Sequence, residues 1–256
     1  MENKVSKPID FKRLGRRFAK NYIHHNASAP RGYVPDDTNP LQEYFFSKNA
    51  GRVLWKWHHY LEIYHRHLNK FRATTPSLIE VGVADGGGLE MWRDYFGPQA
   101  TISGVDIDPG CRKYADKFTQ VFIGDQADRT FWQSVRKAIP RLNVVIDDGG
   151  HSAVQQMITL EELLPHIQPG GVYICEDIHG AEHGFNDYLH GIVDVINSWQ
   201  PKTWKRSVSG PTIRRRAFQQ DILSVHHYPF LVVLEKAPYA PTLLVSEKRG
   251  NVAALD

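Results

Sequence analysis

The chain has 256 residues, of which 41% are hydrophobic and 23% are charged, a balance typical of a globular protein with a full core. Its formal net charge of +3 is too small to indicate a nucleic-acid partner. The two cysteines, Cys111 and Cys175, are too few for a disulfide framework, and no apolar run approaches the roughly 20 residues that span a bilayer.

The N-terminal part of the chain is predicted to be an arm with cap helices over residues 1–70. Residues 1–22 are basic but contain no continuous apolar run, so they do not resemble a signal peptide, and we expect a cytoplasmic protein. Residues 55–71 predict a helix, because their large apolar residues recur at helical spacing. These residues are Trp57, Leu61, Tyr64 and Leu68.

From residue 77 onward, short apolar runs alternate with helical stretches. Strands are predicted at residues 78–83, 101–108, 121–125, 143–148 and 171–177. This alternation predicts right-handed crossovers and a doubly wound, mostly parallel α/β sheet. Two further runs, 222–228 and 230–236, predict an antiparallel hairpin that completes a Rossmann-like sheet of seven strands.

The predicted sheet sets the expected domain limits. The main domain is expected over residues 71–240, followed by a tail of residues 241–256. A basic segment, 202–216, precedes the hairpin and is predicted to be an exposed loop.

A nucleoside cofactor is expected at the carboxyl edge of this sheet, where ligands bind in such folds. Glu80 and the glycines Gly82 and Gly86 follow the first strand, and glycines there let the backbone approach a ligand closely. Asp106 ends the second strand, where its carboxylate can accept hydrogen bonds from ribose hydroxyls. Asp125 follows the third strand and can accept from an adenine amino group.

The loop after the first strand favours S-adenosylmethionine over a dinucleotide. A dinucleotide site typically has the spacing GxGxxG, but Ala84 replaces the middle glycine here. The carboxylates of Glu80 and Asp85 would repel a pyrophosphate, whereas they tolerate a zwitterionic amino acid and a sulfonium cation.

Acidic residues follow the fourth and fifth strands, and these predict a metal site. Asp147, Asp148 and His151 follow one strand, and Glu176 and Asp177 follow its expected neighbour. Carboxylates crowded at adjacent strand ends repel one another unless a cation binds between them. Hard oxygen ligands favour Mg²⁺ or Mn²⁺ over zinc.

The expected metal suggests a reaction at a hydroxyl group. A bound cation lowers the pKa of a hydroxyl, which a nearby base can then deprotonate. His151 is the best-placed base, although a supporting or helix-capping role remains an alternative.

Several motifs together resemble one family. They are IEVGV-x-x-GG-x-L-x-MWRDYFG-x-x-A, GVDIDP, FIGDQ-x-D, VIDDGGH-x-x-x-QQ and GGVY-x-x-EDIH. Over residues 56–236 the chain resembles the metal-dependent sugar O-methyltransferases typified by the macrocin and mycinamicin enzymes, a group that also includes enzymes named cephalosporin hydroxylases. The resemblance implies a class I methyltransferase that acts on sugar hydroxyls of glycosylated natural products, a small-molecule glycoside as partner, and a homo-oligomer.

The resemblance also implies roles for individual residues. Asp148, Glu176 and Asp177 match the metal ligands of the family, and His151, together with Asp148, matches its catalytic residues. The residues expected at the cofactor are Glu80, Gly82, Gly86, Asp106, Asp125 and Asp147.

Two departures from the family leave the acceptor open. Gly88 stands where serine is frequent, and residues 180–184 differ from relatives near the expected acceptor site. Alternatives are methylation of a catechol-like hydroxyl, an NAD-type oxidoreductase and a non-catalytic subunit that binds S-adenosylmethionine.

The many histidines are not predicted to form a metal site. His58, His59, His65 and His67 fall on different faces of one helix, so we expect structural or surface roles. His226 and His227 are adjacent in a predicted strand, where at most one of a neighbouring pair faces the core.

Overall fold

The computed structural model describes residues 10–22, 34, 36–179, 183–198, 204–207, 210–247 and 249–250. The chain divides into two compact units, Met1–Pro35 and Asp36–Asp256. In the first unit, helix α1 (Phe11–Lys20) is capped by Asp10, whose side chain accepts a hydrogen bond from the Arg13 amide. None of the described helices has the length and apolar character needed to cross a membrane.

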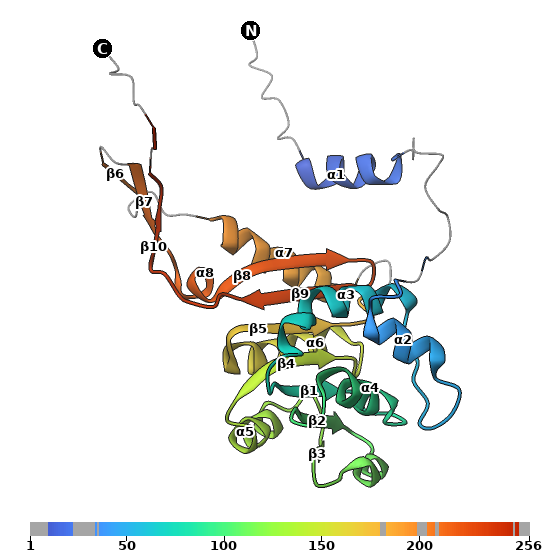
Figure 1. Ribbon diagram of the computed structural model, residues 1–256. Coiled ribbons are helices and arrows are strands. Elements are labelled where there is room, and N and C mark those ends of the chain that lie inside the picture. The colour runs from blue at the N-terminus through green and yellow to red at the C-terminus, as the bar shows by residue number, and fades with distance from the viewer. Residues whose placement is uncertain are drawn as a thin grey trace, which may run out of the picture. The chain divides into compact units, whose positions relative to one another are not determined.

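A seven-stranded sheet in the order β3-β2-β1-β4-β5-β9-β8 forms the centre of the second unit (Figure 1). Strands β1 to β5 run parallel, and β9 pairs antiparallel with both β5 and β8. The strands are β1 (Ser77–Val81), β2 (Thr101–Asp106), β3 (Thr119–Ile123), β4 (Leu142–Asp147), β5 (Ile167–Cys175), β8 (Ile222–Tyr228) and β9 (Leu231–Lys236). The predicted doubly wound sheet with a closing hairpin is confirmed.

Helices cover both faces of the sheet, and this explains why the central strands are almost continuously apolar. The α-helices are α2 (Pro40–Ser47), α3 (His58–Leu68), α4 (Gly87–Phe96), α5 (Arg129–Ala138), α6 (Ala153–Leu163), α7 (Gly184–Asn197) and α8 (Ala217–Asp221). Short 3₁₀ turns are η1 (Asn69–Phe71), η2 (Pro109–Tyr114) and η3 (Leu164–His166).

Two hydrophobic cores lie on opposite faces of the sheet, because successive side chains of a strand alternate in direction. Leu78 of β1 belongs to the core that contains Trp92 of α4, together with residues of α2 and α3. Ile79 belongs to the core that contains Trp132 of α5, together with residues of α6 and α7. Leu61, Tyr64 and Leu68 of the predicted apolar face are buried in the first of these cores. Trp57 is 50% exposed and precedes α3, which begins at His58.

The strand register brings the predicted acidic residues to one edge of the sheet. Asp147 of β4 lies opposite Val81 of β1 and Cys175 of β5. The next residues continue the backbone pairing, since Asp148 N donates to Val81 O and Glu176 N donates to Asp147 O, each at 2.9 Å. Asp148 and Glu176 therefore leave adjacent strands at the same end.

The prediction of an exposed loop at 202–216 was wrong for the described part of that segment. Strands β6 (Trp204–Ser207) and β7 (Gly210–Arg214) form a hairpin, and β7 also pairs with β10 (Leu243–Val245) in a second, three-stranded sheet. The partner β10 lies within the predicted tail of 241–256, so the basic segment alone carried no signal of this pairing. Residues 202, 203, 208 and 209 lie outside the described residues.

Candidate functional site

The loop between β1 and α4 packs closely against its neighbours and requires glycine at two positions. Gly82 has a φ of 89°, and a Cβ placed there would lie 2.0 Å from the carbonyl oxygen of Asp148. Gly86 has a φ of 76°, and its Cβ would lie 2.9 Å from the Tyr114 ring. Residues other than glycine rarely adopt a positive φ. The predicted glycine loop therefore lies directly against the start of the loop after β4.

Asp106 holds the backbone of the glycine loop. Its Oδ2 accepts hydrogen bonds from the amides of Val83 (2.9 Å) and Ala84 (3.0 Å), and its Oδ1 accepts from the Asp108 amide (2.8 Å). Asp106 also lines a cavity of about 420 Å³ with the exposed Asp125. A carboxylate oxygen can accept more than one hydrogen bond, so Asp106 can hold the loop and still bind a ligand in that cavity.

A second cavity, of about 330 Å³, adjoins the first. Glu80, Glu176 and Asp177 line only the second cavity, whereas Gly82, Asp148 and His151 line both. Of the residues predicted to bind the cofactor, Glu80, Gly82, Asp106 and Asp125 line one or both cavities, whereas Gly86 lines neither. The three predicted metal ligands line the second cavity. This arrangement could hold a nucleoside on one side and a second reactant on the other.

Three side chains of the second cavity converge as a cation site would require. Asp148, His151 and Asp177 each offer one ligand atom, and these atoms all lie within 4.8 Å of one another. His151 Nε2 is 3.8 Å from Asp177 Oδ2. The two carboxylates, Asp148 and Asp177, are suitable ligands for the predicted Mg²⁺ or Mn²⁺. The third converging group is the imidazole of His151 and not the predicted Glu176, and a histidine beside the ion can act as a base.

Asp177 is positioned by residues that precede or begin helix α3. Its Oδ1 accepts hydrogen bonds from Trp57 Nε1 (3.1 Å) and from the Tyr60 hydroxyl (2.9 Å). Its backbone has a φ of 54°, which costs about 1–2 kcal/mol for a residue other than glycine. The two side-chain donors fix Asp177 in this conformation, with its second oxygen toward His151.

Lys56 is a residue of the site that the sequence analysis missed. Its Nζ lies 2.5 Å from Asp148 Oδ2 and 2.9 Å from Glu176 Oε2. Burial lowers the pKa of the ammonium, but the carboxylates of Glu176 and Asp148 outweigh this effect, so the pKa is raised and Lys56 stays charged. The available signal was a lysine between two tryptophans, Trp55 and Trp57.

Glu176 therefore has a lysine partner, in addition to its predicted role as a metal ligand. Its side chain is only 1% exposed, and burial and the nearby Asp148 raise its pKa, whereas the Lys56 ammonium acts in the opposite direction and favours the carboxylate. Lys56 contacts both of its carboxylate oxygens. Asp148, His151 and Asp177 form the solvent-accessible part of the site, and the side chain of Glu176 is buried beneath them.

Glu80 lines the second cavity, and one of its carboxylate oxygens is buried and unpaired among the described residues. Its Oε1 accepts a hydrogen bond from Trp92 Nε1 at 3.0 Å, whereas the buried Oε2 has no hydrogen-bond partner among the described residues. Burial raises the pKa of Glu80 to about 7. A buried oxygen without a partner is costly, so this atom suits a ligand donor such as an amino group. The unpaired oxygen of Glu80 therefore supports the prediction that the ligand carries a zwitterionic amino acid, as S-adenosylmethionine does.

Gly88 leaves room for that carboxylate. A Cβ at Gly88 would lie 2.2 Å from Glu80 Oε1. The glycine that departs from the family pattern therefore accommodates Glu80 in its observed position.

Asp147 lies behind the site, which corrects its expected position at the cofactor. Its side chain is 1% exposed, lines neither cavity, and accepts hydrogen bonds from Gln126 Nε2 (2.9 Å) and the Tyr173 hydroxyl (2.8 Å). Asp147 and Asp148 are consecutive, so their side chains leave the strand in opposite directions. Asp147 supports the site from the core.

Comparison with solved structures identifies the fold. The chain aligns over 80% of its length with 56% of a structure titled "MycE Methyltransferase from the Mycinamycin Biosynthetic Pathway in Complex with Mg and SAH", with a TM-score of 0.61 and 24% identity. This is a class I methyltransferase fold.

Sequence comparison confirms the resemblance predicted from the motifs, although no protein-family profile matches the chain. The 8-demethyl-8-alpha-L-rhamnosyl tetracenomycin-C 2'-O-methyltransferase of Streptomyces olivaceus is 27% identical over 73% of this chain and 52% of its own length. The mycinamicin VI 2''-O-methyltransferase of Micromonospora griseorubida is 30% identical over 57% of this chain and 37% of its own length. The chain thus spans about half or less of these relatives.

Proposed function

We propose that this protein transfers a methyl group from S-adenosylmethionine to a sugar hydroxyl of a glycosylated natural product. The observation that carries the proposal is the meeting of two cavities at Gly82, Asp148 and His151. The cavity beside Asp106 and Asp125 has the carboxylates that suit a nucleoside. The other cavity has the convergent acids and the base that suit a hydroxyl acceptor. The names of the two sugar O-methyltransferases that resemble the chain support the same substrate class.

Asp148 and Asp177, with Glu176 behind them, would hold Mg²⁺ or Mn²⁺. When bound, the ion would lower the pKa of an acceptor hydroxyl and orient it. His151 is 42% exposed and faces both cavities, so its imidazole is accessible to the acceptor. In the proposed transfer the carbon–sulfur bond breaks, a carbon–oxygen bond forms, and His151 takes the hydroxyl proton. Asp177, 3.8 Å from His151 Nε2, would stabilise the resulting imidazolium.

Product analysis tests the proposal. The purified protein is incubated with S-adenosylmethionine, Mg²⁺ and a panel of deoxysugar glycosides and catechols, and products are identified by mass spectrometry. Methylated glycosides are expected. Methylation of catechols alone would contradict the sugar acceptor. Calorimetric binding of a nicotinamide cofactor, without binding of S-adenosylhomocysteine, would instead support an oxidoreductase. Binding of S-adenosylhomocysteine without any methylation would support a non-catalytic subunit.

The Asp148→Ala variant tests the metal-binding part separately. Metal-stimulated turnover should be lost, while the affinity for S-adenosylhomocysteine stays within a few-fold of the wild type, because other residues bind the nucleoside. Calorimetry measures the affinity. Full activity of the wild-type protein in excess EDTA would contradict a metal-dependent reaction.

The expected cellular setting belongs to the same proposal. Cys111 and Cys175 are both buried free thiols, which supports a reducing compartment such as the cytoplasm. We also propose that the protein is a homo-oligomer that needs no nucleic-acid partner, and sedimentation velocity of the purified protein tests its subunit number.

A further inference from the structure

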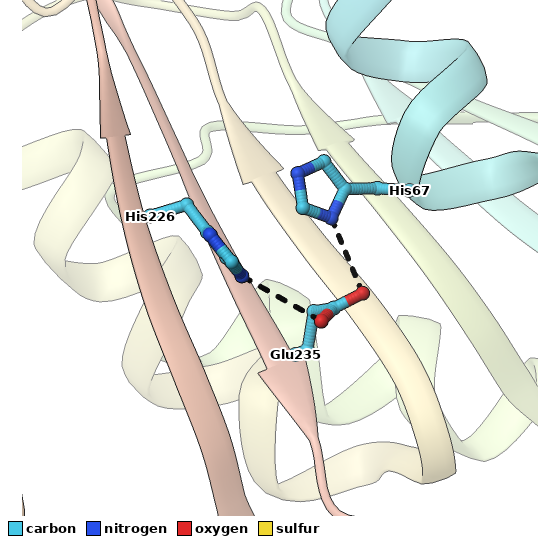
Figure 2. A group of neighbouring side chains, drawn as sticks. All are labelled: His67, His226 and Glu235. Atoms are coloured by element: carbon cyan, nitrogen blue, oxygen red, sulfur yellow. Dashed lines mark hydrogen bonds and ion pairs between the residues drawn. The ribbon is translucent and has the colours of Figure 1, made fainter.

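A second group of potential metal ligands lies apart from the candidate active site. His67 of α3, His226 of β8 and Glu235 of β9 point toward one another (Figure 2). His67 Nδ1 lies 3.2 Å from Glu235 Oε1, and His226 Nε2 lies 3.6 Å from Glu235 Oε2. One ligand atom from each residue lies within 4.8 Å of the other two. Helix α3 and the two strands of the β8–β9 hairpin, which is far from α3 in sequence, thus contribute one ligand each.

The fold brings His67 and His226 together, whereas neighbouring histidines in the sequence point elsewhere. His226 and its neighbour His227 point to opposite faces of β8: His226 lies against His67, with ring centroids 4.7 Å apart, whereas His227 stacks on His190 of α7. On α3, His65 bonds to the Tyr95 hydroxyl instead. The expectation of purely structural or surface roles followed from helical spacing alone, and it could not account for ligands from the hairpin.

The chemical state of the group suits a transition metal. Burial lowers the pKa of His67, so its imidazole is neutral near pH 7 and can donate a lone pair. Although burial opposes ionisation of Glu235, His67 and the Lys70 ammonium lower its pKa, which favours the carboxylate. An ion bound at His67 Nδ1 would replace the hydrogen bond between this nitrogen and Glu235, with the imidazole proton on Nε2 beside the Tyr228 hydroxyl. Two imidazoles with one carboxylate are a recurrent zinc ligand set, with a fourth position for water or another ligand.

We propose that His67, His226 and Glu235 bind one divalent transition-metal ion such as Zn²⁺. The imidazoles distinguish this site from the candidate magnesium site, in which carboxylates predominate. His226 is 38% exposed, which gives an ion access from solvent. The site lies outside the cavities of the proposed methyl transfer, so it does not depend on that function.

Neighbouring groups are compatible with an ion in this position. Lys70 Nζ lies 3.4 Å from Glu235 Oε1, but its side chain is 44% exposed and can turn toward solvent. Ser224 Oγ lies 2.9 Å from His226 Nε2 and 3.2 Å from Glu235 Oε2, so an ion bound at this nitrogen would replace the Ser224 hydrogen bond. The Tyr228 hydroxyl lies 2.9 Å from His67 Nε2 and orients the ring whose Nδ1 faces Glu235. The contact from Tyr228, made to the ring nitrogen that faces away from Glu235, is of the kind that supports metal-binding histidines.

An ion at this site would link helix α3 to the β8–β9 hairpin. The same helix carries Tyr60, which donates to Asp177 in the candidate active site. The proposed ion therefore has a structural role, in which it fixes the end of α3 that lies away from the acid cluster.

Zinc titration of the full-length protein, prepared without a histidine tag and stripped with chelator, tests the proposal. Excess Mg²⁺ is present to compete at the acid cluster, and isothermal calorimetry measures stoichiometry and affinity. One Zn²⁺ per chain is expected. His226→Ala should weaken binding at least about tenfold, and so should Glu235→Gln. His227→Ala is the matched control, because its ring faces the other side of the strand, and it should bind zinc as the wild type does.

Two further measurements distinguish the proposed zinc site from the acid cluster and show whether a variant has lost binding because it is misfolded. Asp148→Asn disrupts the acid cluster and should leave this zinc affinity unchanged. Co²⁺ bound at the proposed site should give visible ligand-field absorption that His226→Ala removes, while circular dichroism verifies that the variant is folded. Absence of zinc binding by the wild type in Mg²⁺, or equal binding by His226→Ala and His227→Ala, would overturn the proposal.

Discussion

The Lys56 ammonium and the Glu176 carboxylate form a buried ion pair, with Nζ and Oε2 2.9 Å apart and side chains only 3% and 1% exposed. Removal of one partner from such a pair leaves an uncompensated charge in the interior. Lys56→Met should therefore lower the free energy of unfolding by about 3–5 kcal/mol, measured by urea denaturation at pH 7.

Lys48→Met is the matched control for this substitution. Lys48 also pairs with a glutamate, Glu90, at 3.2 Å, but Glu90 is 35% exposed. Its loss should cost less than about 1 kcal/mol, as for other exposed pairs. Equal destabilisation by the two substitutions would show that burial of the Lys56 pair is not decisive.

The contact between Gly82 and the Asp148 backbone predicts a strong effect of a single methyl group. Gly82 and Gly97 both have positive φ angles, 89° and 84°, but a Cβ at Gly97 meets nothing within 4 Å. Gly97→Ala should cost only the conformational strain of about 1–2 kcal/mol. Gly82→Ala should cost a further 1–3 kcal/mol, roughly, for overpacking. Thermal unfolding compares the two, and similar melting temperatures would contradict the close contact.

The position of Asp106 predicts a defect in cofactor binding. Asp106→Ala removes a carboxylate that lines the nucleoside cavity and holds two loop amides, so the affinity for S-adenosylhomocysteine should fall by about 1–3 kcal/mol in calorimetry. Asp108→Ala is the control, because Asp108 caps the following turn through Gly110 and does not line the cavity. Unchanged affinity of Asp106→Ala would place the nucleoside elsewhere.

Asp147 predicts a specific dependence of stability on pH. Burial raises its pKa from 3.8 to about 7, so the folded protein holds this proton more tightly than the unfolded chain. The resulting stabilisation is complete below pH 3.8 and is lost as the pH rises through 7. By the size of the shift, the loss amounts to at most about 4 kcal/mol.

Asp147→Asn provides the comparison for this pH dependence. The variant has no proton to release at this position, so its unfolding free energy should fall less between pH 5 and pH 8 than that of the wild type. Urea denaturation across this range measures both proteins. Parallel curves would mean that Asp147 does not titrate in this range.

Much of the fold follows from local pattern in the sequence. Apolar runs that end in acid or glycine indicate parallel strands, and the carboxyl ends of neighbouring parallel strands meet at one edge. This was enough to predict that Asp148 and Asp177 lie together. The opposite directions of Asp147 and Asp148 also follow from strand geometry, so the position of Asp147 was predictable in principle.

Other features depend on contacts between distant segments, which local pattern does not reveal. Lys56 lies in an irregular segment before α3, yet it reaches acids that follow β4 and β5. The hairpin of β6 and β7 is completed by β10, and the His67 cluster joins a helix to strands near the end of the domain. Such pairings depend on how the packed elements are arranged in space.

Helix α3 is attached to the β8–β9 hairpin near both of its ends. The Tyr60 hydroxyl shares its one proton between Asp177 and the carbonyl oxygen of Phe230 in the turn, and His67 bonds to Glu235 within β9. When one contact breaks, the other still holds the helix, so α3 leaves the sheet only in a rare, joint opening event. Its amide protons should therefore exchange with solvent at a common, slow rate.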